Sequence, residues 1–413
     1  MGARDRRSAR TATRVCAFAL LVAALALAGC GAQPGQDRSS SADSTAVPTR
    51  NPVAQPTAAQ TTDPIADYAA DRLSTMTLPE KVASLLMLHR PGTDAGALRS
   101  FVDHYGLGGL ILMGDNVPAS VGELRTMTDR VSADPGLPVL IGIDQEGGTV
   151  SRLVEDRAPG ATELRSMPVP ATTDAFRSRS TLLKNAGITV NFGIVADVTA
   201  DPHSFIYDRV LGTGASSAAQ RVAAAVAGER GRVVSTLKHF PGHGAAAGDS
   251  HRGIPMTGLD HDAWLADEAP PFQAGIEAGA GMVMFGHLAY SAVDARPASL
   301  SPVWHRILRK ELGFRGVAIT DDMLMLQHSG LPQYASASEN AIAALKAGNT
   351  MLLYVLPAQP GAAGIDVGAL IASIADAVDS GRIPESVIDD DVRRLLEVRR
   401  AVSGETGPFT VSK

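Results

Sequence analysis

Cysteine and aromatic residues are scarce in this sequence, and no segment is basic enough to suggest a nucleic acid partner. The 413 residues include two cysteines, and aromatic residues make up 4% of the chain. The formal net charge is −6, and 45% of the residues are hydrophobic. These values are ordinary for a globular protein of one large or two medium domains, so composition leaves the fold class open.

The apolar run VCAFALLVAALALA near the N-terminus is too short to span a bilayer as a permanent helix. It follows MGARDRRSARTATR, which contains five arginines, and the two together are typical of a secretory signal. The residues Leu27-Ala28-Gly29-Cys30 resemble the lipobox of bacterial lipoproteins, in which the cysteine is lipidated and becomes the mature N-terminus. An ordinary secretory signal with an incidental cysteine is the alternative. Since Cys16 lies within the signal, lipidation of Cys30 would leave the mature chain with no disulfide and no free thiol.

The segment after Cys30 contains almost no large apolar side chain. It is rich in Ser, Thr, Ala, Pro and Gln, and such a composition cannot bury enough surface to offset chain entropy. We therefore expect a signal peptide at residues 1–29, a disordered tether at 30–64, a folded domain at 65–402 and a tail at 403–413. The tether would hold the folded domain at the outer face of the cell membrane.

Eight apolar or β-branched runs recur along the folded part, separated by stretches compatible with helices. Strands buried on both faces form continuous apolar runs, and alternation of strands with helices predicts a parallel sheet. Eight such units favour an α/β fold of the single (β/α)8 TIM-like barrel type. An open doubly wound sheet is the alternative, but no glycine-rich dinucleotide motif follows the first run. The runs are VASLLML near 82, GGLILM near 108, LPVLIGID near 137, ITVNFGIVAD near 188, VVSTLKHF near 233, GMVMFGHL near 281, GVAITDD near 316 and NTMLLYVL near 349.

Polar residues follow five of these runs, at the carboxyl ends where barrel strands gather functional groups. A single Asp or His at such a point is commonly a cap or a satisfied buried group, but five strands ending this way predict a polar pocket. Because neighbouring strand residues alternate sides, we expect Asp322 to point away from it. The sequence leaves His287 open to a supporting role or a purely structural one. The residues concerned are Asp144, Asn191, Asp197, the motif KHFPGHG, His287, Asp321 and Asp322.

The stretch KHFPGHGAAAGDSHRGIP raises the hypothesis of a metal site. His239, His243, Asp249 and His251 are all possible ligands. Zinc ligands usually come at short fixed spacings on rigid elements, whereas GAAAGDS separates His243 from His251, and Lys238 would bring a positive charge next to the ion. A catalytic metal is therefore the less favoured alternative, and we expect no metal and no cofactor.

Proton transfer from a loop is the favoured interpretation of the same stretch. Asp249 lies two residues before His251, so its carboxylate can orient the imidazole and stabilise its protonated form. The glycines and alanines around them would let the loop close over a ligand. Asp321, at the end of another strand, could supply a nucleophile from the other side of the reacting centre. This is the logic of a retaining glycosidase, with His in place of the usual carboxylic acid.

At these residues the sequence resembles glycoside hydrolase family 3, and within it the bacterial lipoprotein form of the NagZ-type β-N-acetylglucosaminidases. The resemblance is carried by the blocks GGLILMGDN, IDQEGGTVSR, NFGIVADV, DRVLGT, KHFPGHG, DSH, FGHLAY, ITDDMLM and AGNTMLL. It implies that Asp321 forms the covalent glycosyl-enzyme, that His251 is general acid and then base, and that Asp249 is its partner. It also implies that the sugar is bound by Asp144, Arg152, Arg209, Lys238 and His239.

The predicted function is that of an exported, lipid-anchored, retaining exo-β-N-acetylglucosaminidase. The substrates would be β-GlcNAc-terminated muropeptides or cell-wall saccharides, and lipidated Cys30 would attach the protein to the membrane. One alternative is a β-N-acetylglucosaminide phosphorylase, because a histidine acid/base does not repel an incoming phosphate dianion as a carboxylate would. The other is a noncatalytic saccharide-binding lipoprotein, although a mere binder has no need for a nucleophile and an acid on separate strands.

Overall fold

The computed structural model describes residues 63–410. The predicted signal peptide, the predicted lipidation site Cys30 and residues 30–62 of the predicted tether lie outside the described residues, whereas Pro64, the last residue assigned to the tether, begins the first helix. Among those that are described, no helix is both long enough and apolar enough to cross a membrane.

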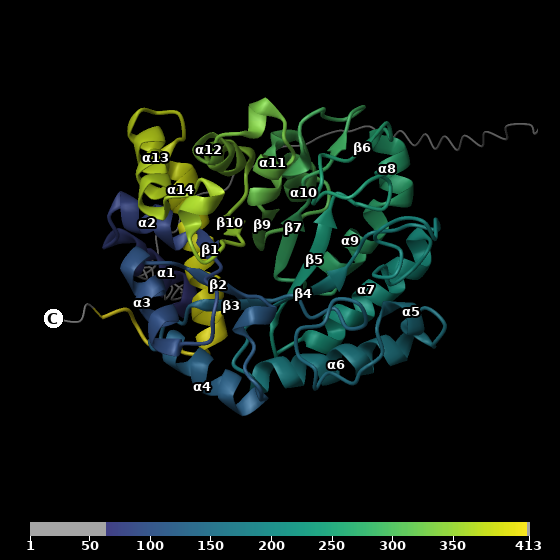
Figure 1. The fold of residues 1–413 in the computed structure, drawn as a ribbon, viewed down its shortest axis with the longest axis horizontal. Helices are drawn as coiled ribbons and strands as arrows, with labels where there is room; N and C mark the ends of the chain where they lie inside the picture. The colour runs from purple at the N-terminus through teal and green to yellow at the C-terminus, as the bar shows by residue number, and fades with distance from the viewer. Residues whose placement is uncertain (1–62, 411–413) are drawn as a thin grey trace, which may run out of the picture. The chain divides into compact units, whose positions relative to one another are not determined.

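Eight parallel strands form a closed barrel, which confirms the predicted fold (Figure 1). Neighbours around the barrel follow chain order, and the last strand pairs with the first, Leu86 lying opposite Leu352. The strands are β1 (Leu86–Leu88), β2 (Gly109–Leu112), β3 (Leu140–Ile143), β4 (Val190–Val195), β5 (Val234–Phe240), β7 (Met282–Phe285), β9 (Val317–Asp322) and β10 (Met351–Tyr354). A separate two-stranded sheet pairs β6 (Met256–Thr257) with β8 (Ala289–Tyr290).

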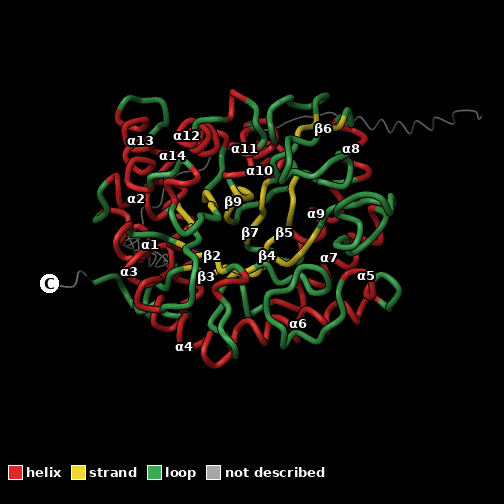
Figure 2. The backbone as a smooth tube through the Cα atoms, viewed as in Figure 1, coloured by secondary structure: helices red, strands yellow, loops and turns green. Residues whose placement is uncertain are grey.

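Helices surround the strands as an outer layer, shown in red around the yellow barrel in Figure 2. They are α1 (Pro64–Ser74), α2 (Leu78–Ser84), α3 (Ala95–Tyr105), α4 (Val121–Val131), α5 (Ala161–Leu164), α6 (Val169–Asn185), α7 (Ala215–Glu229), α8 (His261–Asp267), α9 (Ala269–Glu277), α10 (Pro302–Lys310), α11 (Leu324–His328), α12 (Ala337–Ala347), α13 (Val367–Asp379) and α14 (Glu385–Ser403). Four short 3-10 helices, η1 (Gly114–Asn116), η2 (Ala298–Leu300), η3 (Pro332–Tyr334) and η4 (Pro360–Ala363), lie in connections among the described residues.

Capping residues explain why a typical barrel helix begins and ends where it does. Before α3, the Asp94 carboxylate accepts hydrogen bonds from the N–H groups of Gly96 and Ala97, which have no partner inside the helix. After α3, Gly106 adopts the left-handed conformation with φ 73°, which a side chain would disfavour.

The first strand begins later than its apolar run suggested. Residues 82–84 of the run belong to α2, and β1 starts at Leu86. The reason lies upstream, where Pro79 occupies the first turn of α2 and Thr77 N donates to Glu80 Oε2 at 2.7 Å. This capping interaction fixes a helix start, and the apolar residues that follow are buried within the helix.

Side chains fill the barrel interior, so the barrel is a packed core rather than a channel. A Cβ atom on Gly109 would lie 2.6 Å from Met87, and one on Gly142 would lie 2.6 Å from Phe192 and 3.3 Å from Met87. Because β1 and β3 are not neighbours, Met87 reaches Gly142 through the interior, and the two glycines provide the space that Met87 and Phe192 fill.

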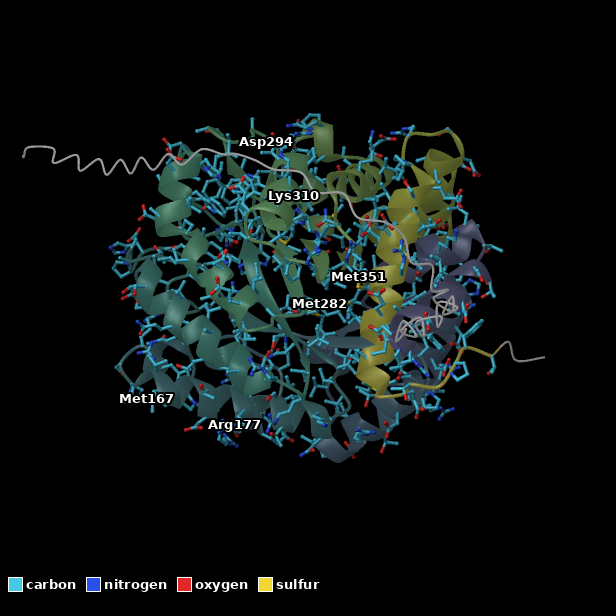
Figure 3. All side chains as sticks on the ribbon, turned by 180° about the vertical axis from the view of Figure 1, so that it is seen from behind. Met167, Arg177, Met282, Asp294, Lys310 and Met351 are labelled. Atoms are coloured by element: carbon cyan, nitrogen blue, oxygen red, sulfur yellow. The ribbon has the colours of Figure 1, made fainter. Side chains whose placement is uncertain are left out.

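Successive side chains of β7 alternate between the interior of the barrel and the layer between the barrel and the helices. Met282 and Met284 belong to the same buried cluster as Met87, whereas Val283 and Phe285 pack in the cluster that contains Trp304 of α10. Figure 3 shows Met282 among the strands and Arg177 on the outer helical layer. The side chains of Met282 and Met284 therefore point into the barrel, and the polar groups of the cavity lie beyond Met284, at the carboxyl end of the strands.

Candidate active site

A cavity of about 320 Å³ lies at the carboxyl ends of the barrel strands. Seven of the eight residues predicted for the site line it, and Asp249 is the exception. The lining residues are Ile111, Met113, Asp144, Glu146, Val150, Arg152, Phe205, Arg209, Lys238, His239, Ser250, His251, Met284, Asp321, Asp322, Met325, Leu353 and Val355. The structure thus brings together residues from loops and strand ends spread over more than half of the described chain.

Asp321 lies near the end of β9 and faces the cavity. Burial raises the pKa of its carboxyl, but the nearby rings of His239 and His287 outweigh this effect, so the pKa lies below its ordinary value. The backbone N–H of Asp322 also donates to Asp321 Oδ1 at 2.8 Å. The carboxylate is therefore ionised at neutral pH, as a nucleophile must be.

Asp322 also lines the cavity, so the expectation that it points away was wrong. The alternation fails because β9 carries a bulge: Met351 pairs with Ile319, but Leu353 pairs with Asp322. One extra residue on β9 breaks the period of two.

The Asp322 carboxyl is nevertheless anchored by the backbone. Its Oδ1 accepts hydrogen bonds from the N–H of Leu324 at 3.1 Å and of Val355 at 3.0 Å. Burial raises the pKa of Asp322 to about 6, so this neighbour of Asp321 ionises less readily than an ordinary aspartate. These two bonds hold the start of α11 and the end of β10 beside Asp321.

The Asp249 and His251 pair lies on the loop after β5. Asp249 Oδ1 accepts a hydrogen bond from His251 Nδ1 at 2.7 Å and another from the His251 backbone N–H at 3.0 Å. With Nδ1 donating, Nε2 is the ring atom left to exchange a proton with a substrate. The His251 side chain is 67% exposed, and Gly248 in this loop has φ 114°, so the pair sits at the mouth of the cavity on an irregular segment.

Five charged side chains form an ion-pair network along one wall of the cavity. Lys238 Nζ contacts Asp144 Oδ1 at 2.7 Å and Glu146 Oε1 at 2.8 Å. Arg209 donates to both Glu146 oxygens, at 2.9 and 2.7 Å, and Arg152 approaches Asp144 at 3.7 Å. The two cations lower the pKa of Glu146 to about 2 in spite of its burial.

Glu146 is the residue of this network that the sequence reasoning missed. It lies two positions after Asp144, and side chains two positions apart in an extended chain point to the same side. This rule could have placed Glu146 next to Asp144. Its partner Arg209 is 63 residues away in the chain, which a reading of local motifs does not reveal.

Asp197, after β4, is fully buried and holds the end of β5. Asp197 Oδ2 accepts from His239 Nδ1 at 2.7 Å, and Oδ1 accepts from the backbone N–H of His239 at 3.1 Å and of His243 at 2.6 Å. Burial opposes ionisation, but these partners lower the pKa of Asp197 to about 2. The His239 ring is thereby fixed with Nε2 directed away from Asp197.

His287, whose role the sequence left open, lies beside the backbone of Asp322, next to Asp321. It is fully buried, with Nε2 donating to the Asp322 carbonyl at 3.0 Å, so Nδ1 accepts from the Ser299 hydroxyl at 2.7 Å. Burial lowers the pKa of His287. The ring thus supports the backbone beside Asp321 and does not line the cavity.

The residues considered for metal binding have other partners. His239 bonds to Asp197, His251 bonds to Asp249, and the His243 ring packs edge-on against Phe205 with centroids 4.5 Å apart. Within residues 63–410, no group of three or more His, Cys, Asp or Glu side chains is placed to hold a metal ion.

An ionised carboxylate on one strand and an Asp–His pair on a loop thus share a small polar pocket at the carboxyl face of a (β/α)8 barrel. This combination defines a hydrolase of the glycosidase class. The chain belongs to glycoside hydrolase family 3, because residues 77–398 match the model of the "Glycosyl hydrolase family 3 N terminal domain". The resemblance inferred from the motifs is confirmed, and the protein is a glycoside hydrolase.

Curated relatives of the chain are β-hexosaminidases. The chain is 30% identical over 395 residues to "Beta-hexosaminidase LpqI" of Mycobacterium tuberculosis, covering 92% of this chain and 96% of the relative. It is 34% identical over 263 residues to a "Beta-hexosaminidase" of Methylococcus capsulatus, covering 62% of this chain and 77% of the relative.

Solved structures of related proteins have a similar fold. The family 3 β-N-acetylglucosaminidase from a Paenibacillus species matches with a TM-score of 0.73 and 30% identity over 82% of this chain and 65% of that enzyme. M. tuberculosis LpqI matches with a TM-score of 0.71 and 28% identity over 83% of this chain and 97% of that chain.

Proposed function

We propose that this protein is a retaining exo-β-N-acetylglucosaminidase that removes terminal GlcNAc from peptidoglycan fragments while anchored to the outer face of the cell membrane through lipidated Cys30. The observation that carries the activity is the shared cavity of Asp321 and His251, in which a carboxylate of lowered pKa and an acid/base imidazole come from different elements. The β-hexosaminidase names of the relatives support the same substrate class.

The size of the cavity supports removal of single terminal sugars. Ligand pockets commonly enclose roughly 300–1,000 Å³, and about 320 Å³ lies at the small end of that range. Such a pocket holds one ring and its substituents, with the next sugar outside the mouth. The hydroxyl groups of that ring would meet the charged wall formed by Asp144, Arg209 and Lys238.

The chemistry follows from the two sides of the pocket. In the first step Asp321 attacks the anomeric carbon, the glycosidic C–O bond breaks, and His251 Nε2 gives its proton to the leaving oxygen. In the second step neutral His251 takes a proton from water, the water oxygen attacks the anomeric carbon, and the bond to Asp321 breaks. Asp249 stabilises the imidazolium form of His251 in both steps.

The mechanism is tested by trapping the covalent intermediate. The protein without residues 1–30 is incubated briefly with 2-acetamido-5-fluoro-β-glucosyl fluoride and analysed by intact-mass spectrometry and peptide mapping. An adduct on Asp321, absent from Asp321→Ala, is expected, together with a loss of at least about 10⁴-fold in turnover of an aryl β-GlcNAc by the variant. An adduct on another residue, or full activity of Asp321→Ala, would contradict the proposal. Release of GlcNAc 1-phosphate faster than GlcNAc when phosphate is added would identify a phosphorylase.

The substrate and the anchor are tested separately from the chemistry. Hydrolysis of β-GlcNAc-(1→4)-MurNAc with kcat/KM above that of the N,N′-diacetylchitobiose control supports peptidoglycan fragments as substrates, and the reverse order argues against them.

The full chain produced in a bacterial host is expected in the membrane fraction with incorporated palmitate. Cys30→Ala should abolish both properties, and retention of both by this variant would refute lipidation at Cys30.

A further inference from the structure

We infer that Glu146 is a positioning residue, which holds Arg209 and Lys238 in the orientation that binds the sugar. This inference rests on the sugar-binding roles assigned to those two cations in the proposed function. It assigns to Glu146 a role that differs from binding the sugar directly and from proton transfer.

The contacts of Glu146 leave it little capacity for a substrate. Oε2 accepts from Arg209 Nε at 2.9 Å, and Oε1 accepts both from Arg209 Nη2 at 2.7 Å and from Lys238 Nζ at 2.8 Å. Its side chain is only 4% exposed. Three charge-assisted bonds therefore occupy most of the acceptor sites of one buried carboxylate.

Arg209 depends on Glu146 more than Lys238 does. The side-chain hydrogen bonds of Arg209 among the described residues both go to Glu146, in the parallel two-bond geometry that fixes a guanidinium plane. Lys238 has a second partner in Asp144. Removal of the charge on Glu146 would thus leave Arg209 as a nearly buried cation without a close counter-ion, free to change its orientation.

The pairing of charges supports the same role. Glu146 pairs with Lys238 and Arg209, and Asp144 pairs with Lys238 and Arg152, so each cation of the wall already has a carboxylate partner before a neutral sugar enters. The N–H groups that remain on the cations can then bond to hydroxyls without a change in the ion pairs. A site organised in advance loses less entropy when the sugar binds.

Glu146 is excluded as the acid or base of the reaction by the same geometry. Its pKa of about 2 keeps it ionised at any working pH, and both of its oxygens already accept from cations. A carboxylate in that state neither delivers a proton nor takes one from water near neutrality.

The experiment measures kcat and KM of Glu146→Gln and Arg209→Gln, singly and together, with aryl β-GlcNAc and its 3-, 4- and 6-deoxy analogues. Glu155→Gln, an exposed glutamate on the loop after β3, is the matched control. We expect Glu146→Gln to lower kcat/KM about 10- to 100-fold, mainly through KM, which is the range that a charge-assisted hydrogen bond covers. The effects of the two substitutions should be strongly non-additive.

The deoxy analogues separate positioning from a general loss of structure. One of the deoxy analogues lacks the hydroxyl that Arg209 binds. If Glu146 acts through Arg209, kcat/KM of both variants should equal that of the wild type on this analogue and fall below it on the other two. Glu146→Asp, which keeps the charge, should recover part of the loss, and thermal melting checks that each variant is folded. If Glu146→Gln melts too early for assay, the deoxy pattern of Glu146→Asp decides.

Two results would overturn the inference in distinguishable ways. An unchanged KM for Arg209→Gln would show that Arg209 does not bind the sugar, and the assumption taken from the proposed function would fail. A raised KM for Arg209→Gln, with Glu146→Gln unchanged or losing activity equally on every analogue, would show that Glu146 does not position it.

Discussion

Single carboxylates in this site hold the histidines and cations that line the cavity, and Asp197 shows how many contacts one of them makes. Its Oδ2 bonds to His239 Nδ1, while its Oδ1 is held by two backbone N–H groups. The His239 ring is in turn one of the groups that lower the pKa of Asp321. Asp197 thus acts on Asp321 through His239.

Asp197→Asn should keep the shape and the two backbone bonds but turn an NH2 group toward His239 Nδ1. The ring would then carry its proton on Nε2 only, and the interaction with His239 that lowers the pKa of Asp321 would weaken. We expect kcat/KM to fall on the order of 10²-fold and its acidic limb to shift to higher pH as the pKa of Asp321 rises. The pH profile measures this, with the exposed Asp201→Asn as control. A parallel fall at every pH would argue against the coupling.

At the residue scale, the motifs predicted the groups that line the cavity better than the contacts that hold those groups in place. Asp144, Lys238 and Asp321 stand at strand ends, a position the barrel dictates. Glu146 and Asp197 act through partners that are distant in the chain or are backbone atoms. Such contacts exist only after the chain has folded, so no local pattern reports them.

Among the elements, β9 contributes most directly to the site, because two successive aspartates of this bulged strand, Asp321 and Asp322, line the cavity. The bulge is held by Thr320, whose Oγ1 accepts from the buried N–H of Leu353 at 3.1 Å. Sequence alternation predicted one side for Asp321 and the other for Asp322, and a bulge is invisible to that rule. The two-residue strands β6 and β8 escaped notice for a simpler reason, since a strand of that length has no period.

Thr320→Val should remove the hydroxyl while keeping the volume of the fully buried side chain. The N–H of Leu353 would then lose this acceptor, which costs about 1–3 kcal/mol of unfolding free energy. Since the neighbouring Asp321 would shift, we expect kcat to fall more than KM rises. Urea unfolding and steady-state kinetics measure both, and Thr320→Ser, which keeps the hydroxyl, should retain kcat. Equal losses of kcat in the two variants would contradict the role of the hydroxyl.

For the whole molecule, the eight-strand barrel was predictable because its strands are buried on both faces and therefore appear as apolar runs between helices. The closed barrel then brings strand ends from residues 144 to 321 to one face, which is why motifs scattered along the chain form one pocket. The fold also contains a buried carboxyl that the sequence did not single out, Glu268 at the junction of α8 and α9.

Glu268 predicts how the stability of the whole domain varies with pH. Burial, and to a lesser extent the charge of Asp197, raises its pKa to about 9, and its Oε2 has no hydrogen-bond partner among the described residues. An unfolded glutamate titrates near its model value of 4.5, so between these two pKa values the folded state binds more protons than the unfolded state. Unfolding free energy must then fall as pH rises through this window.

Glu268→Gln removes the titrating group while keeping a neutral side chain of the same size. Relative to the wild type, the variant should be equally stable near pH 4.5 and more stable by on the order of 2–4 kcal/mol near pH 8. Chemical unfolding at both pH values measures the difference, and Glu277→Gln, at an exposed position on α9, should leave it near zero. A difference independent of pH would mean that Glu268 is ionised in the folded protein, and the carboxyl would then need a cationic partner in place of the proton.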